Sequence, residues 1–135
     1  MTGLLERVLV GIGGLVSMCF GIWHFSVPKA WQWNSYIDAR ATELVVAVHA
    51  INVFFSLSLV LFGLINAFLV LGNRSNKYSI VVALGATCVL WFVRVLLQIT
   101  NPQGTMNPFL QFSMLSAFIL VFFCYAVPLF LILRR

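Results

Sequence analysis

Charged residues are scarce in this sequence. Only 8% of its 135 residues are charged, and 62% are hydrophobic. A soluble domain has about 25% charged and about 45–50% apolar residues. Because a short chain has a high surface-to-volume ratio, a soluble fold of this length could not bury so much apolar surface. The composition excludes an ordinary soluble domain and indicates that much of the surface faces lipid.

The sequence also lacks the motifs of soluble enzymes and of metal sites. Its three cysteines, Cys19, Cys88 and Cys124, lie inside apolar runs without C-x-x-C spacing, which indicates small buried hydrophobic side chains. There is no G-x-x-x-x-G-K-[ST], H-E-x-x-H or G-x-S-x-G pattern. Since the eight basic residues are scattered, we interpret the net charge of +5 as a sign of membrane topology and expect no nucleic-acid partner.

Four long apolar stretches are present instead. A spanning helix needs about 20 mostly apolar residues, and suitable stretches lie at about 4–25, 44–71, 78–100 and 109–133. The second and third connections are short, so the helices that they join should be antiparallel neighbours. The sequence therefore predicts an all-α integral membrane protein, a single antiparallel bundle of four transmembrane helices covering residues 1–135.

The first connection, about 26–43, is longer and rich in tryptophan. It contains Trp31, Trp33 and Tyr36, and Trp23 comes just before it. Aromatic side chains with a polar atom favour the level of the lipid headgroups, which predicts a short helix or turn lying along the membrane interface. The alternative is a lid over a binding site.

Basic residues in short loops predict the orientation. One side of the membrane would have Arg7, Arg74, Lys77, Arg134 and Arg135. The other side would have Lys29 and Arg40. This imbalance predicts a multi-pass protein of the cell inner (plasma) membrane with both termini in the cytoplasm and the first and third loops outside.

Several polar residues lie within or beside the apolar spans. An ionisable group at mid-membrane costs at least ~2.5–3.5 kcal/mol, so such groups are functional candidates. Counted at 1.5 Å per residue from the predicted helix ends, each helix contributes a polar group at similar depth in the outer half of the bundle. The candidate ligand-binding residues are His24, Glu43, His49, Asn52, Arg94, Gln98 and Gln111. The inner half is predicted to be apolar packing with basic residues at its end.

Helical periodicity places small and polar residues on one face of each of the first three spans. The three faces consist of Gly14, Ser17, Gly21 and His24, of His49, Asn52, Ser56 and Gly63, and of Thr87, Trp91, Arg94, Gln98 and Asn101. Small residues let helices approach closely. We therefore expect these faces to converge on the bundle axis.

Four interpretations of the polar cluster are open. It could bridge helices by hydrogen bonds, with Arg94 reaching outward or pairing with Glu43 or Asp38. It could bind a small ligand, a lipid headgroup or a quinone, with Arg94 as the partner of an anion or carbonyl. His24 and His49 could ligate a haem or a metal ion, although two histidines without a third ligand are a weak metal signal. A histidine oriented by Glu43 or Arg94 could act as a general base.

One segment suggests a family. The first span ends in Gly21-Ile22-Trp23-His24-Phe25-Ser26-Val27-Pro28. Together with the four short-looped helices, it resembles the DoxX-like group of small bacterial membrane proteins, whose members often end their first helix with a glycine, a His-Phe-like pair and a proline. The resemblance implies a four-helix bundle in a bacterial inner membrane, and relatives are linked to quinone-coupled oxidation complexes or to partner proteins in redox defence. The residues that match are Gly21, His24, Phe25 and Pro28.

The leading hypothesis is therefore a non-enzymatic accessory or partner subunit with an outward-facing polar site for a small molecule or lipid. Its expected partners are the lipid bilayer and other membrane-protein subunits or further copies of the chain. The rival hypothesis is a quinone- or haem-linked redox protein that uses His24 and His49.

Overall fold

The structure is a computed structural model, and it describes residues 2–72, 75–105 and 107–135. Within these ranges the chain is helical and contains no strand. The elements are α1 (Leu4–His24), α2 (Val27–Ala30), the short 3-10 helix η1 (Trp33–Ser35), α3 (Thr42–Leu71), α4 (Lys77–Thr100) and α5 (Pro108–Arg134). The predicted all-α fold class is confirmed.

The helices α1, α3, α4 and α5 are long and apolar enough to cross a membrane. They have 21, 30, 24 and 27 residues. Large apolar side chains such as Phe54, Phe68 and Phe109 are more than two-thirds exposed on the outer faces of α3 and α5. Such faces fit a lipid environment, as the composition predicts.

Local sequence signals explain where several helices begin. The side chain of Asn76 accepts a hydrogen bond from the Ser79 backbone N–H at 2.8 Å and caps α4. The side chain of Asn107 caps α5 in the same way, and Pro108 occupies its first turn, where no backbone N–H is needed. Pro28 lies in the first turn of α2, beyond the end of α1 at His24.

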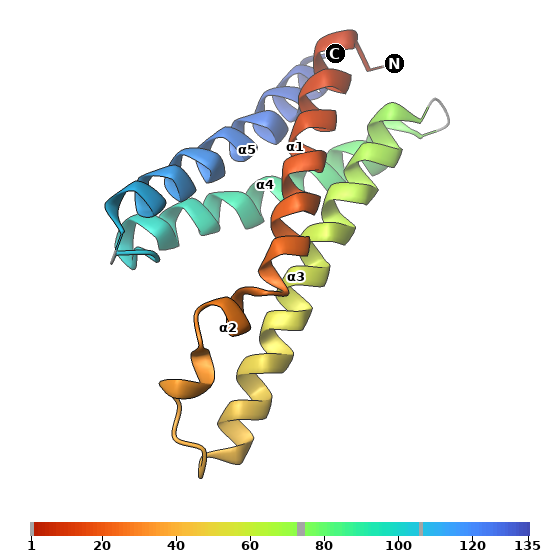
Figure 1. The fold of residues 1–135 in the computed structure, drawn as a ribbon. Coiled ribbons are helices and arrows are strands. Elements are labelled where there is room, and N and C mark those ends of the chain that lie inside the picture. The colour runs from red at the N-terminus through yellow and green to blue at the C-terminus, as the bar shows by residue number, and fades with distance from the viewer. Residues whose placement is uncertain (1, 73–74, 106) are drawn as a thin grey trace.

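The four long helices form two pairs (Figure 1). The helices α1 and α3 lie side by side, as do α4 and α5, and the two pairs cross obliquely. α1 also packs against α5, whereas α3 and α4 meet over a much smaller contact. Both ends of the chain lie at the same end of the bundle, which we call the terminal end. The opposite end, with α2 and η1, is called the loop end.

Small residues on the facing surfaces bring α1 and α3 together, as the periodicity predicts. A Cβ atom added to Gly14 would lie 3.0 Å from the backbone oxygen of Gly63, and one added to Gly21 would lie 2.7 Å from that of Ser56. Larger side chains at these positions would force the backbones apart. This close contact fixes the end of α1, with His24, against the middle of α3.

The terminal end contains a buried charge. Glu6 is only 1% exposed, and its Oε1 lies 2.9 Å from a guanidinium nitrogen of Arg135. The prediction of plain apolar packing with basic residues in this half was therefore wrong at Glu6. Cys19 also differs from expectation: Cys88 and Cys124 are buried, but Cys19 is exposed on α1.

Candidate ligand-binding site

A cavity of about 400 Å³ opens at the loop end, between α1, α3 and α4 and beneath the Trp-rich connection. Its polar lining comes from His24, Asn52, Arg94, Asn101 and Gln103. Its aromatic lining comes from Trp23, Trp31, Trp33 and Phe55. Few polar groups within a mostly apolar wall are typical of a small-molecule site.

Among the described residues that line this cavity, Arg94 is the only lysine, arginine, aspartate or glutamate. It is half-buried and donates a hydrogen bond to Gln103 Oε1 at 2.7 Å. Its guanidinium carbon also lies 4.3 Å from the centre of the Phe118 ring, within the range of a cation–π contact. Within the part of the chain that the structure describes, no carboxylate forms an ion pair with it.

Gln98 holds the third loop in place beside Arg94. The side chain of Gln98 is 2% exposed, and its Nε2 donates to the backbone oxygen of Gln103 at 2.9 Å. The backbone N–H of Gln103 donates in return to Gln98 Oε1 at 3.4 Å. This reciprocal pair folds the loop back over the end of α4 and presents the Gln103 side chain to Arg94.

His24 is fixed by α3. Ser56 Oγ donates to the Asn52 backbone oxygen at 2.7 Å and lies 3.3 Å from His24 Nδ1. Because a hydroxyl has one hydrogen, His24 Nδ1 is the donor in the second contact. The neutral ring then has its acceptor at Nε2.

Asn52 lines the cavity and has one buried acceptor without a hydrogen-bond partner among the described residues. Its Nδ2 donates to the His24 backbone oxygen at 3.3 Å. Its Oδ1 is buried and, among the described residues, accepts no hydrogen bond. A buried polar atom without a partner costs about 1–3 kcal/mol, so a donor at this point would stabilise the site.

The Trp-rich connection covers the cavity. It contains α2 and η1, and Trp31 and Trp33 both line the space above His24. The ring of His24 packs edge-on against Phe55, with 4.7 Å between ring centres. The connection thus has the position expected of a lid, while its exposed residues, such as Tyr36, remain free to meet the headgroup region.

The structure brings four of the predicted site residues to one place and leaves three elsewhere. His24, Asn52 and Arg94 line the cavity, and Gln98 supports it from behind. His49 lies outside the lining, and its Nε2 forms a 2.8 Å hydrogen bond with Asn34 Oδ1.

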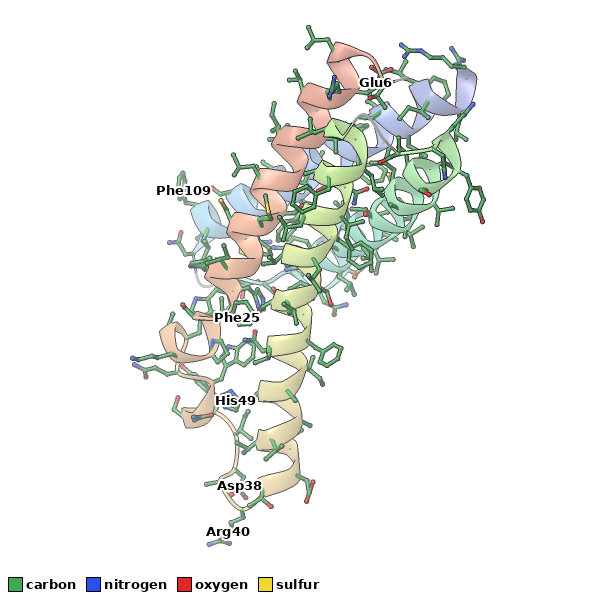
Figure 2. All side chains as sticks on the ribbon, turned by 90° about the vertical axis from the view of Figure 1, so that its right-hand side faces the viewer. Glu6, Phe25, Asp38, Arg40, His49 and Phe109 are labelled. Atoms are coloured by element: carbon green, nitrogen blue, oxygen red, sulfur yellow. The ribbon has the colours of Figure 1, made fainter. Side chains whose placement is uncertain are left out.

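The other two predicted residues also lie apart. Glu43 is exposed in the first turn of α3, and Gln111 is half-buried at the start of α5, outside the cavity lining. Figure 2 shows why the residues at the start of α3 lie apart, because α3 and the loop beside it extend past the other helices. In this view His49 lies beyond Phe25 as seen from Glu6, and Asp38 lies farther out still. The expectation of similar depth was therefore wrong, and neither Asp38 nor Glu43 reaches Arg94.

Metal ligation finds little support in this arrangement. Within residues 2–72, 75–105 and 107–135, no three His, Cys, Asp or Glu side chains lie close enough together to hold an ion. His24 and His49 have separate partners, Ser56 and Asn34. His24 lines the cavity and His49 does not, so the two rings do not face each other across that cavity, as the ligands of a haem iron there would need to.

Two residues with evident roles were missed by sequence reasoning. Gln103 lies in a polar loop, and nothing in the neighbouring sequence indicates that the loop folds back onto α4. Glu6 could have been found, because an acidic residue in the first turns of a span requires a cation, and the chain ends in Arg134 and Arg135.

No protein-family model matches the chain, and searches of curated proteins and of solved structures find no significant match. The class of protein thus follows from the fold alone. The chain is a small multi-pass membrane protein with four helices able to span the bilayer.

Proposed function

We propose that this protein binds the polar head of a small molecule or lipid in the cavity at the loop end, as a non-enzymatic component of a bacterial inner membrane. The observation that carries the proposal is Arg94, a half-buried cation in an aromatic cavity that contacts a neutral amide oxygen and an aromatic ring.

The positive charge of Arg94 is only partly compensated by its neutral contacts. A positive charge taken partly out of water loses hydration, and an amide oxygen and a π-face replace only some of it. An anionic or carbonyl oxygen in the cavity would complete its coordination, and a donor beside that oxygen would satisfy Asn52 Oδ1. A ligand head that carries an oxygen for Arg94 and a hydrogen-bond donor for Asn52 fits the polar lining of the cavity.

The orientation is part of the proposal. The basic residues at the terminal end, among them Arg7, Lys77 and Arg135, outnumber those at the loop end, which supports cytoplasmic termini. Arg74, which belongs to the same count, lies outside the described residues. The cavity would then face the periplasm or extracellular space.

The size of the chain supports an accessory or partner role. Four helices with only small hollows between the described residues leave no room for a broad transport pathway within a single copy. The DoxX-like resemblance supports the same assignment, since its matching residue Gly21 lies at the α1–α3 contact and His24 lines the cavity.

A quinone is a second candidate ligand. The indole rings of Trp23, Trp31 and Trp33 offer flat apolar walls for a ring, and Arg94 could donate to a quinone carbonyl. This candidate keeps the redox hypothesis open without requiring His49.

The test is to identify what co-purifies with the protein. The chain would be extracted in a mild detergent, and bound small molecules would be released and identified by mass spectrometry. The variant Arg94→Gln should lose about tenfold or more of the bound molecule, because a charge-assisted hydrogen bond is worth roughly 1.5–3 kcal/mol.

The matched control is Arg40→Gln, which removes the same charge from an exposed residue at the far tip of the loop end (Figure 2). It should retain the molecule at the level of the unmodified chain. Equal retention by both variants, or no bound molecule at all, would refute the proposal.

A further inference from the structure

A second hollow adjoins the cavity. It is a slot of about 280 Å³ between α3 and α4, and its lining is almost wholly apolar. Leu59 and Phe62 of α3 form one wall, and Leu90 and Val93 of α4 form the other. Phe55, Arg94 and Leu97 line both the slot and the cavity, so the two hollows are adjacent and meet at these three side chains.

The slot has a defined direction and a defined end. It runs along α4 from Arg94 to Thr87, about 10 Å at 1.5 Å per residue. At Thr87 the two helices are joined, because Asn66 Nδ2 donates to Thr87 Oγ1 at 2.6 Å. The slot therefore leads from the polar cavity toward the terminal end and closes within the bundle.

The slot lies where α3 and α4 meet, a contact smaller than those of α1 with α3, α1 with α5 and α4 with α5. α1 packs closely on α3 and α5, and α4 packs on α5, whereas α3 and α4 meet only over a short stretch. Leu90, Val93 and Leu97 are about half exposed along this line. In a bilayer, these exposed side chains face acyl chains, and a ligand can enter between α3 and α4 from the side.

From this shared lining, and resting on the proposed function, we infer that the ligand is an anionic single-chain amphiphile derived from the membrane. Its head lies against Arg94 in the cavity, and its chain lies in the slot between α3 and α4. Arg94 stands where the two hollows meet, so one molecule can satisfy the cation and fill the apolar slot. A ligand without an apolar chain would not fill the slot, which surrounding lipid would then occupy.

The probes that test this are dodecyl phosphate, methyl phosphate and dodecanol, which are the whole amphiphile, the head alone and the chain alone. Binding to the full chain would be measured by native mass spectrometry. Dodecyl phosphate should bind at least about a hundredfold more tightly than methyl phosphate, since each buried methylene adds to the affinity. It should also bind at least about tenfold more tightly than dodecanol, because the latter leaves Arg94 without an anion.

Paired variants distinguish binding in the slot from binding to the lipid-facing surface of the helices. Leu90→Trp fills the slot from α4, and the adjacent Val89→Trp adds the same group to a lipid-facing position outside it. Ser58→Trp and Leu57→Trp form the same pair on α3. Each slot variant should lower the affinity for dodecyl phosphate about tenfold, whereas each control variant should leave that affinity unchanged. Two walls are tested, so misfolding of one variant does not decide the outcome.

The outcomes distinguish this inference from the proposed function. If methyl phosphate binds as well as dodecyl phosphate and the slot variants have no effect, the inference is wrong and the headgroup site stands. The inference is also wrong if Val89→Trp weakens binding as much as Leu90→Trp, because the chain is then ordinary surrounding lipid. If Arg94→Gln leaves the binding of every probe unchanged, the proposed function itself fails. Loss of a bound protein chain in the slot variants would show that a helix of a partner occupies the slot, and would also refute the inference.

Discussion

The guanidinium of Arg135 lies 2.9 Å from the carboxylate of Glu6, and this ion pair joins the residue that follows α5 to the first turn of α1. The two partners differ in their surroundings. The side chain of Glu6 is 1% exposed, and that of Arg135 is 57% exposed. The pair therefore serves chiefly to neutralise a carboxylate that the packing of the terminal end has buried.

Removing the two partners should have unequal effects. The variant Arg135→Gln leaves the buried carboxylate of Glu6 without its cation and should lower the free energy of unfolding by about 1–3 kcal/mol. Adding Glu6→Gln to it should recover part of that loss, since no buried charge then remains. The measurement is a double-mutant cycle by SDS titration of the purified protein. Simple additivity of the two changes would contradict the role assigned to the pair.

The contact between α1 and α3 gives a second prediction. In Gly21→Ala the new methyl group would lie 2.7 Å from the Ser56 backbone oxygen, so the helices must separate. We expect a loss of about 1–3 kcal/mol of stability in the same titration, as in an overpacked core. The control is Gly85→Ala, where nothing lies within 4 Å, and this change should be neutral or stabilising by up to ~1 kcal/mol. A similar loss in both variants would show that the close approach is unimportant.

A third prediction concerns the hydrogen bond between α3 and α4. Thr87→Val keeps the shape of the side chain but removes the acceptor of Asn66 Nδ2. Hydrogen bonds between membrane helices contribute about 0.6 kcal/mol on average and up to about 1.7. The expected loss of stability lies in that range. The control Thr100→Val affects an exposed hydroxyl bonded only within its own helix and to a neighbouring side chain, and should change stability less.

The fourth prediction is topological. An enzyme reporter that works only in the cytoplasm, fused after Arg135, should be active, and one that works only in the periplasm should be silent. The basic residues of the terminal end are the physical reason. A periplasmic reporter that is active at this position would reverse the orientation and place the cavity on the cytoplasmic side.

The fifth prediction tests haem binding. Because His24 lines the cavity while His49 lies outside it and has its Nε2 bonded to Asn34, the purified protein should show no Soret absorbance. A Soret band that disappears in both His24→Ala and His49→Ala would contradict the arrangement and restore the bis-histidine hypothesis. His24→Ala alone should still weaken binding of a ligand in the cavity, since the ring forms part of the lining.

The fold was largely predictable, because spanning helices are encoded locally. A run of about 20 apolar residues, ended by a proline or glycine, determines a span without knowledge of the rest of the chain. The periodicity of small residues was equally informative, since Gly14, Gly21 and Gly63 all lie at the contact between α1 and α3.

The candidate site was only partly predictable. Helical faces placed Asn52 and Arg94 correctly toward the interior, because a face depends on spacing within one helix. Depth was the weaker argument, since it was counted from the predicted helix ends and assumed that the outer ends of all four helices lie at one level. The 30 residues of α3 break that assumption and move His49 and Glu43 away from the cavity. The position of Gln103 depends on a turn whose shape the sequence pattern does not encode.

The length of α3 links the site to the membrane around it. At 1.5 Å per residue its 30 residues extend about 45 Å, against about 32 Å for the 21 residues of α1. A hydrocarbon core of about 30 Å matches α1 and is too thin for α3, so α3 must tilt or thicken the bilayer around it. Its loop-end half bears Asn52 and Phe55, which face Arg94 across the cavity. A thinner bilayer, by increasing the tilt of α3 relative to α4, would alter the width of the cavity, so the affinity for a ligand should vary with the thickness of the host membrane.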